Sequence, residues 1–182
     1  MTTEELLALP DDGVERWLIR GSLRENRMID TRLRTPAHAS AMAALGGILG
    51  KWQRRPDADK GKLFAGALCR LSADPATAAA IDIVFILQDV VEGIAKKASY
   101  IDGVPRLAVE ILSPADKVGD VAEKIDVYLK CGIALVWIVD PDFQTVTVHQ
   151  SGADPQFFNR NQVLSAEPHL PGLKINVAEI FD

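Results

Sequence analysis

Two carboxylates stand inside otherwise apolar stretches of the sequence, where an acid is unexpected. Asp82 lies in the run 81–87, and Glu110 lies in the run 107–112. An ionised carboxylate is not tolerated in an apolar core without a partner, so each acid needs a cation, a metal ion or a proton. Two such groups that meet would repel each other, which raises a pKa or requires a cation between them. Carboxylate oxygens suit Mg²⁺, which takes one or two carboxylates together with waters and phosphate oxygens.

Further groups that suit phosphate chemistry follow Glu110. The main-chain carbonyl of Ile111 is a candidate third metal ligand, and Lys124 lies on one stripe of a predicted helix together with Tyr128. Lys124 can reach back over the strand ends, where it would orient a nucleophile or balance negative charge in the transition state. A metal ion held by the two acids would lower the pKa of a bound water and stabilise a phosphate under attack.

Two plainer explanations account for the same residues. Asp82 could cap a neighbouring turn, and Glu110 could form a buried ion pair with Lys124 that has no further role. Structural ion pairs also perturb pKa values, so the residues alone leave these alternatives open.

The elements that must position these groups are two strands and a helix. The apolar runs 81–87 and 107–112 are bounded by turn signals, which is typical of strands buried on both faces. The following helix is expected to be capped by Ser113 or Asp116 and to end at Gly132, with that glycine in the left-handed conformation.

The remaining pattern predicts two more helices and a series of strands around this unit. We expect helices over 3–9, capped by Thr2 or Thr3, and over 35–55, a hairpin formed by 14–20 and 22–28, and strands over 62–72, 133–139 and 145–149. The final segment 177–181 is expected to dock on the core. The segment 73–79 is expected to be a connection, 88–102 to be irregular, and 145–149 to be an edge-like strand. One face of the hairpin is expected to carry the basic residues Arg16, Arg20, Arg24 and Arg27, as a phosphate-facing patch or as a solvated face.

The composition bounds the class of protein. The 182 residues suit one domain, 1–182, and the 48% hydrophobic share favours a globular core over disorder. The net charge of −5 gives no indication of a nucleic-acid binder and excludes none, because phosphate contacts depend on local patches. The sequence shows no signal peptide, no apolar run long enough for a membrane helix, no zinc-ligand spacing and no phosphate-binding glycine loop. We therefore expect a cytoplasmic protein with free thiols, no membrane contact and no organic cofactor.

Several short motifs resemble those of a known nuclease family. They are Trp17-Leu18-Ile19-Arg20-Gly21-Ser22, Pro36-Ala37-His38, Ile81-Asp82-Ile83, Val109-Glu110-Ile111-Leu112-Ser113-Pro114, the spacing Asp120, Lys124 and Tyr128, the stretch from Gly132 to Pro141, and Pro171-Gly172-Leu173. Together they resemble the Uma-type family of restriction-endonuclease-like proteins, within the PD-(D/E)XK nuclease superfamily. The resemblance covers nearly the whole chain, and the part from Glu110 to Pro141 is the most specific.

The resemblance implies an α/β (α+β) fold with a restriction-endonuclease-like core, a central mixed β-sheet flanked by helices and an N-terminal β-hairpin extension. It implies an endonuclease that hydrolyses DNA phosphodiester bonds with Mg²⁺, for which Mn²⁺ can substitute, and that acts as a homodimer. By this resemblance Asp82 and Glu110 hold the metal. Leu112 stands where the superfamily has its lysine, so Lys124 on the following helix is the substitute.

The chain departs from the family pattern near its start. Trp17 and Arg20 replace acidic residues, and Glu15, which is expected on the same strand face as Trp17, is the candidate stand-in. These departures leave a second function open, that of a catalytically degenerate module with the nuclease fold that binds nucleic acid or a protein partner.

Overall fold

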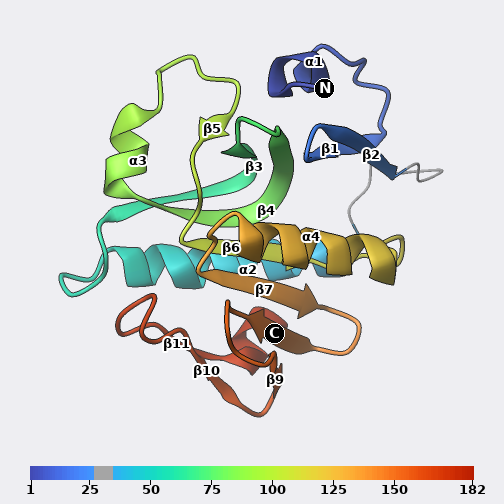
Figure 1. Cartoon of the computed structure of the whole chain (residues 1–182). Helices are drawn as coiled ribbons and strands as arrows, with labels where there is room; N and C mark the ends of the chain where they lie inside the picture. Colours follow the sequence, from blue (N-terminus) through green and yellow to red (C-terminus); the bar gives the residue numbers. More distant parts are fainter. Residues whose placement is uncertain (27–34) are drawn as a thin grey trace.

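The computed structural model describes residues 1–26 and 35–182, which form an α+β fold around a mixed sheet (Figure 1). The strands of the main sheet are β1 (Glu15–Ile19), β2 (Ser22–Asn26), β3 (Gly61–Ser72), β4 (Thr77–Leu87), β5 (Ile101–Asp102), β6 (Leu107–Ile111), β7 (Leu135–Asp140), β8 (Thr145–His149) and β9 (Gln156–Asn159). The helices are α1 (Thr3–Leu7), α2 (Pro36–Gln53), α3 (Gln88–Gly93), α4 (Val118–Lys130) and the 3₁₀ helix η1 (Val177–Ile180). A separate pair of strands consists of β10 (Val163–Ser165) and β11 (Lys174–Asn176).

The strand order makes β4 the centre of the sheet. The order is β2-β1-β4-β6-β7-β8-β9, and β3 pairs with β4 along nearly the whole of that strand. Since β3 occupies one edge of β4, both β1 and β6 lie on the other edge, β1 at Ala78 and β6 from Ile83 onward. A fork therefore opens between β1 and β6, and Asp82 lies at its base.

The two faces of the sheet are covered by different helices, as Figure 1 shows with α4 in front of the sheet and α2 behind it. Leu45 and Leu49 of α2 pack with Phe85 and Trp137 on one face. Tyr128 and its neighbours on α4 pack on the other. Because both faces are buried, the central strands are apolar on both sides, which confirms the expectation for 81–87 and 107–112.

The long helix α2 begins as its sequence predicts. Thr35 precedes it and its hydroxyl accepts the His38 N–H, while Pro36 occupies the first turn, where its missing N–H has no cost. At the other end Trp52 packs edge-on against Phe85 and donates its indole N–H to the Pro171 carbonyl at 2.8 Å.

Several predicted boundaries were wrong. Strand β4 begins at Thr77 rather than at residue 81, and 88–102 contains the short helix α3. Neither Ser113 nor Asp116 caps α4, because Lys117 holds the N-cap position and Asp116 instead accepts the Ser113 N–H and hydroxyl, each at 2.7 Å. Strand β8 is not an edge, since it pairs with both β7 and β9.

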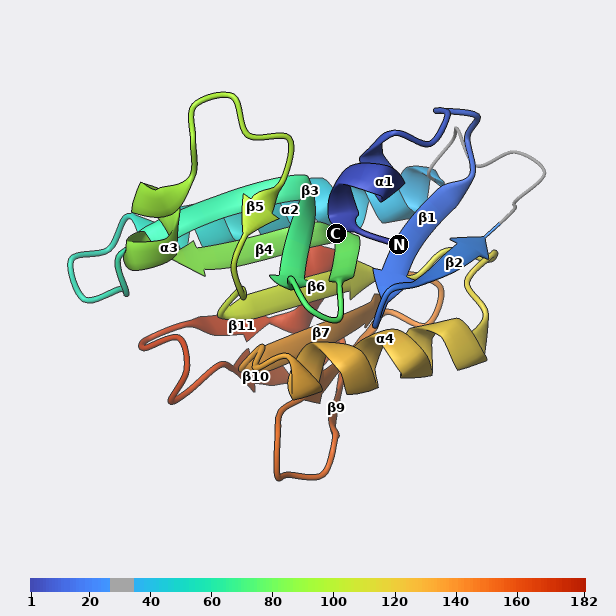
Figure 2. The same ribbon diagram turned by 45° about the horizontal axis from the view of Figure 1, so that its top comes forward.

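The hairpin prediction is confirmed, but its basic face is not. Strands β1 and β2 pair antiparallel around Gly21 (Figure 2). Arg16 is paired with Asp12 and Glu25 on one face, whereas Arg24 lies opposite Trp17 and pairs with Glu123 of α4. The two arginines therefore face different sides and are neutralised by carboxylates. Arg27 lies outside the described residues.

Three further features concern the helices and the cysteines. No helix within residues 1–26 and 35–182 has the length and apolar character needed to cross a membrane. Both cysteines are free thiols, Cys69 fully buried and Cys131 partly so. Gly132 ends α4 with a φ of 98°, as predicted for its left-handed cap.

Candidate active site

The two unexpected carboxylates come together where the β4–β6 ladder ends. The last antiparallel pair is Ile83 with Val109, so one step further brings Asp82 opposite Glu110. At this point the Asp82 carboxylate itself accepts the Ile111 N–H at 2.9 Å. A side chain thus takes over the hydrogen bonding at the base of the fork, which satisfies a buried main-chain donor and fixes the carboxylate.

Asp82 has a second partner that sequence reasoning did not assign to the site. The Nε2 atom of His38 lies 3.3 Å from the same Asp82 oxygen, and both side chains are buried. His38 stands on the first turn of α2, whose start is set by Thr35. The signal was present in the Pro-x-His motif, but only the packing of α2 against the sheet brings this imidazole to Asp82.

Glu110 lies in a largely buried position between β6 and α4. Its side chain is 13% exposed, and the Tyr128 hydroxyl donates to it at 2.6 Å. Burial raises the pKa of Glu110 from 4.5 to about 7, and the nearby charge of Asp82 adds to the effect, although Lys124 and Tyr128 oppose it. This carboxyl group therefore ionises less readily than in water, because burial removes the water that would stabilise its charge.

Lys124 is enclosed between the hairpin and the sheet rather than exposed to solvent. Its ammonium lies 3.1 Å from a Glu15 oxygen, 3.6 Å from a Glu110 oxygen and 5.0 Å from the centre of the Trp17 ring. Burial alone would lower the pKa of Lys124, but the carboxylates of Glu110 and Glu15 raise it above the usual value. The side chain is therefore a permanent cation at neutral pH and unsuited to act as a proton acceptor.

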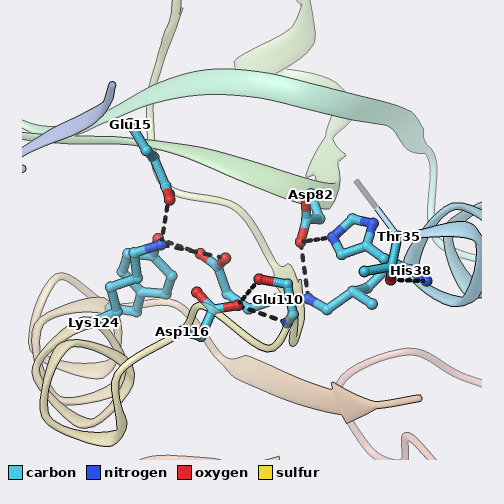
Figure 3. A network of polar contacts seen from close by, with 10 residues as sticks. Glu15, Thr35, His38, Asp82, Glu110, Asp116 and Lys124 are labelled. Atoms are coloured by element: carbon cyan, nitrogen blue, oxygen red, sulfur yellow. Dashed lines mark hydrogen bonds and ion pairs between the residues drawn. The ribbon is translucent and has the colours of Figure 1, made fainter. Parts of the chain in front are cut away.

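Figure 3 shows how these contacts divide the site into two halves. The Glu110 carboxylate turns toward Lys124, and the Asp82 carboxylate turns toward His38 and the main chain of Ile111.

A narrow pocket opens between α4 and β6 beside these groups. Glu110, Asp116, Lys124 and Tyr128 line it, and its interior volume of about 10 Å³ is near the minimum for one water molecule. The pocket thus has room for a water in contact with the acid and the ammonium, and a larger substrate would have to bind at its mouth.

The donor set can be tested against a divalent cation. Within residues 1–26 and 35–182, no three His, Cys, Asp or Glu side chains are close enough together to form a metal cage. A cage is not required by Mg²⁺, which commonly binds one or two carboxylates and keeps its waters. Glu15 and Glu110 both contact the Lys124 ammonium, and the charge of Asp82 adds to burial in raising the pKa of Glu110. The chemistry of the donors therefore fits a hard divalent cation held by two acids.

The structure brings together most of the residues chosen from the sequence. Asp82 and Glu110 meet at one end of the sheet, and Lys124 reaches them from α4. Glu15, the expected stand-in for an acidic residue of the family pattern, contacts Lys124. For Ile111 the contact seen is its main-chain N–H on Asp82, and a role for its carbonyl stays a prediction.

Comparisons with known proteins bear on the fold and the family of the chain. The chain is similar to a crystal structure from Anabaena variabilis whose title calls it a putative nuclease belonging to DUF820, with a TM-score of 0.76 and 19% sequence identity. The match covers 100% of this chain and 97% of the other, and at this identity it shows a shared fold. A search among curated proteins gave no match. The model of the Uma2 family, described as "Putative restriction endonuclease", matches residues 3–178, and the chain therefore belongs to the Uma2 family.

Proposed function

We propose that the protein is a divalent-metal-dependent endonuclease that hydrolyses DNA phosphodiester bonds at the Asp82–Glu110–Lys124 site. One observation carries this proposal: two acids from separate strands and a lysine from a helix converge at the fork of the sheet, although each is at least 14 residues from the next in sequence. Simple packing does not require three charged side chains at the end of a buried ladder, since apolar residues of similar size are often at least as stabilising.

The roles follow from the environments of the side chains. Asp82 and Glu110 would hold the cation, with the Ile111 carbonyl as a further ligand. A divalent ion bound there would supply an activated water and Lewis-acid stabilisation of the phosphate. Lys124 would orient the attacking water and attract the negative phosphate through its fixed positive charge, and would not take up the proton.

Two neighbouring residues keep the lysine in place. Glu15 and Trp17 lie on the same strand and contact the Lys124 ammonium from the hairpin side. A side chain held by its surroundings in this way has little rotamer freedom left to lose when the substrate binds. The β1–β2 hairpin therefore helps to hold the Lys124 side chain in position.

A plasmid assay tests the proposal. Supercoiled DNA is incubated with Mg²⁺ or Mn²⁺ and with wild-type protein, Asp82→Asn or Lys124→Met. We expect nicked or linear product with the wild type and a decrease of about 10²-fold or more in each variant, the typical cost of removing one electrostatic stabiliser. Lys51→Met is the matched control, because Lys51 is an exposed lysine in the last turn of α2 that lines neither pocket, and it should cut like the wild type.

The outcomes separate the alternatives. Equal cutting by the wild type and both site variants would show a contaminant and refute the proposal. DNA binding without cutting would favour the second candidate, a degenerate module with the nuclease fold. The Glu15–Lys124 contact favours that candidate. The Glu15 carboxylate lies 3.1 Å from the Lys124 ammonium and already pairs with the positive charge that a substrate phosphate would need.

A further inference from the structure

A second pocket lies further along α4, apart from the candidate active site. It is enclosed by the β1–β2 turn, the β3–β4 connection and the end of α4, and its polar lining consists of Arg20, Ser72, Thr77, Lys130 and Cys131. Its interior volume is about 160 Å³, which is well above the minimum for one water molecule. A small oxyanion with part of its hydration shell fits in such a space.

The backbone at Arg20 adopts a strained, left-handed conformation. Arg20 and Gly21 form the two-residue loop of the hairpin, with φ values of 49° and 75°. These values belong to a type I′ turn, which favours Asn or Gly at its first position, and another residue there costs roughly 1 kcal/mol. Two hydrogen bonds hold the turn, from the Arg20 N–H to the Thr77 hydroxyl at 3.2 Å and from the Gly21 N–H to the Ala76 carbonyl at 2.7 Å. Strain kept at one residue by its surroundings is typical of functional positions.

The positive charge of Arg20 is available to bind a ligand. In the part of the chain that the structure describes, its guanidinium has no ion-pair or hydrogen-bond partner, whereas Arg16 and Arg24 of the same hairpin are each bound to carboxylates. Lys130 has one partner, Asp126, at 2.6 Å. An ammonium has three donors, so Lys130 retains two of them.

The end of α4 does not compete for this charge. The carbonyls of Val127, Tyr128 and Leu129 already accept main-chain N–H groups of the residues that follow the helix. The negative end of the helix is therefore capped by its own backbone, and Arg20 is not needed there.

We infer that this pocket binds a phosphate group, with the Arg20 guanidinium as its main ligand and Lys130 and the Ser72 hydroxyl as further donors. The planar guanidinium is suited to grip two phosphate oxygens at once. The phosphate can belong to a nucleic-acid strand or be a free ion. The first source fits the position of the pocket relative to the candidate active site. Cys131, which caps α4, follows Lys124 by seven residues, so the two sites are about 10 Å apart along the helix axis.

Cys131 provides a reporter that needs neither metal nor cleavage. It lines the pocket, and Arg20 lies near enough to lower the pKa of its thiol, which burial raises. The other cysteine, Cys69, is not expected to react, because burial raises the pKa of its thiol to about 12. The rate of Cys131 alkylation by iodoacetamide is measured in EDTA, with inorganic phosphate, with a short DNA oligonucleotide, or with chloride at the same ionic strength.

The expected result is slower alkylation with phosphate or with the oligonucleotide, relative to chloride. In Arg20→Asn, which suits the turn and removes the charge, the ligand concentration for half protection should rise about tenfold or more. Arg20→Lys should retain part of the protection. Arg54→Asn is the matched control, because Arg54 is an exposed arginine at the end of α2 outside the pocket, and it should behave like the wild type.

The different ligands in this experiment identify the source of the phosphate, and two outcomes would overturn the inference. Protection by the oligonucleotide alone assigns the site to a nucleic-acid strand, and protection by inorganic phosphate assigns it to the free ion as well. Alkylation that neither ligand slows, or protection that is unchanged in Arg20→Asn, overturns the inference. Because the readout uses no divalent metal, its failure is distinct from a failure of the proposed nuclease activity.

Discussion

Replacing Glu110 with Gln should change how the stability of the metal-free protein depends on pH. The pKa of Glu110 is about 7 in the folded protein, mainly because of burial, against an ordinary value of 4.5. A raised folded-state pKa means that ionisation costs more in the folded chain than in the unfolded one. The contribution of Glu110 is therefore most favourable below pH 4.5 and is lost as the pH rises through about 7, by roughly 3 kcal/mol in total.

Glutamine keeps the size of the side chain and cannot ionise, so it removes this loss. Urea unfolding of the wild type and Glu110→Gln in EDTA, followed by tryptophan fluorescence, measures the free energy of unfolding at about pH 4.5 and at about pH 8. We expect the wild type to lose roughly 3 kcal/mol more than the variant across this range. The attraction between Lys124 and ionised Glu110 is already contained in the pKa of about 7, because Lys124 stays charged throughout this range.

Two results bear on the reasoning. A difference between wild type and variant that is the same at both pH values would refute the claim that Glu110 ionises at a cost. Mg²⁺ or Mn²⁺ added at about pH 8 should raise the free energy of unfolding of the wild type and leave Glu110→Gln nearly unchanged, because a cation that binds the ionised acid stabilises only the folded state.

Two further substitutions test individual contacts. Tyr128→Phe removes the 2.6 Å hydrogen bond to Glu110 and should raise the pKa of that acid further. The free energy of unfolding should fall by about 1.5–3 kcal/mol above pH 7 and by less below pH 5. Urea unfolding at both pH values checks this, and equal losses would contradict it. Trp52→Phe should cost about 1 kcal/mol more than Trp137→Phe in thermal or urea unfolding, because Trp52 donates to the Pro171 carbonyl, whereas the indole N–H of Trp137 has no partner among the described residues. Equal costs for the two variants would show that this hydrogen bond contributes little.

The contacts of α4 explain why the hairpin matters to the site. Arg24 of β2 binds Glu123 in a bidentate pair, and Glu15 of β1 binds Lys124, the next residue of the helix. The first pair is partly exposed, so its worth in stability is small, but it helps to fix the turn of α4 that carries the lysine. The turn of the same hairpin also carries Arg20 to the second pocket, so one local element supports both candidate sites.

Local signals in the sequence were sufficient for the central elements. The apolar runs around Asp82 and Glu110 predicted buried strands, Thr35-Pro36 predicted the start of α2, and Gly132 predicted the end of α4. These features are decided by neighbouring residues, because periodicity, capping and left-handed conformation depend on a few positions in the chain. The lone acids in apolar runs also indicated the candidate site, since a buried charge requires a partner whatever the fold.

Only the tertiary structure decided which partners those charges have. The sequence by itself established the strands, the helix and the candidate acids, but it could not reveal that β1 and β6 share one edge of β4, which opens the fork in which the site lies. It gave no reason to bring His38 to Asp82, or to separate Arg16 from Arg24 on opposite faces of the hairpin. Those outcomes depend on strand pairing and packing between residues far apart in the chain, and no local pattern encodes them.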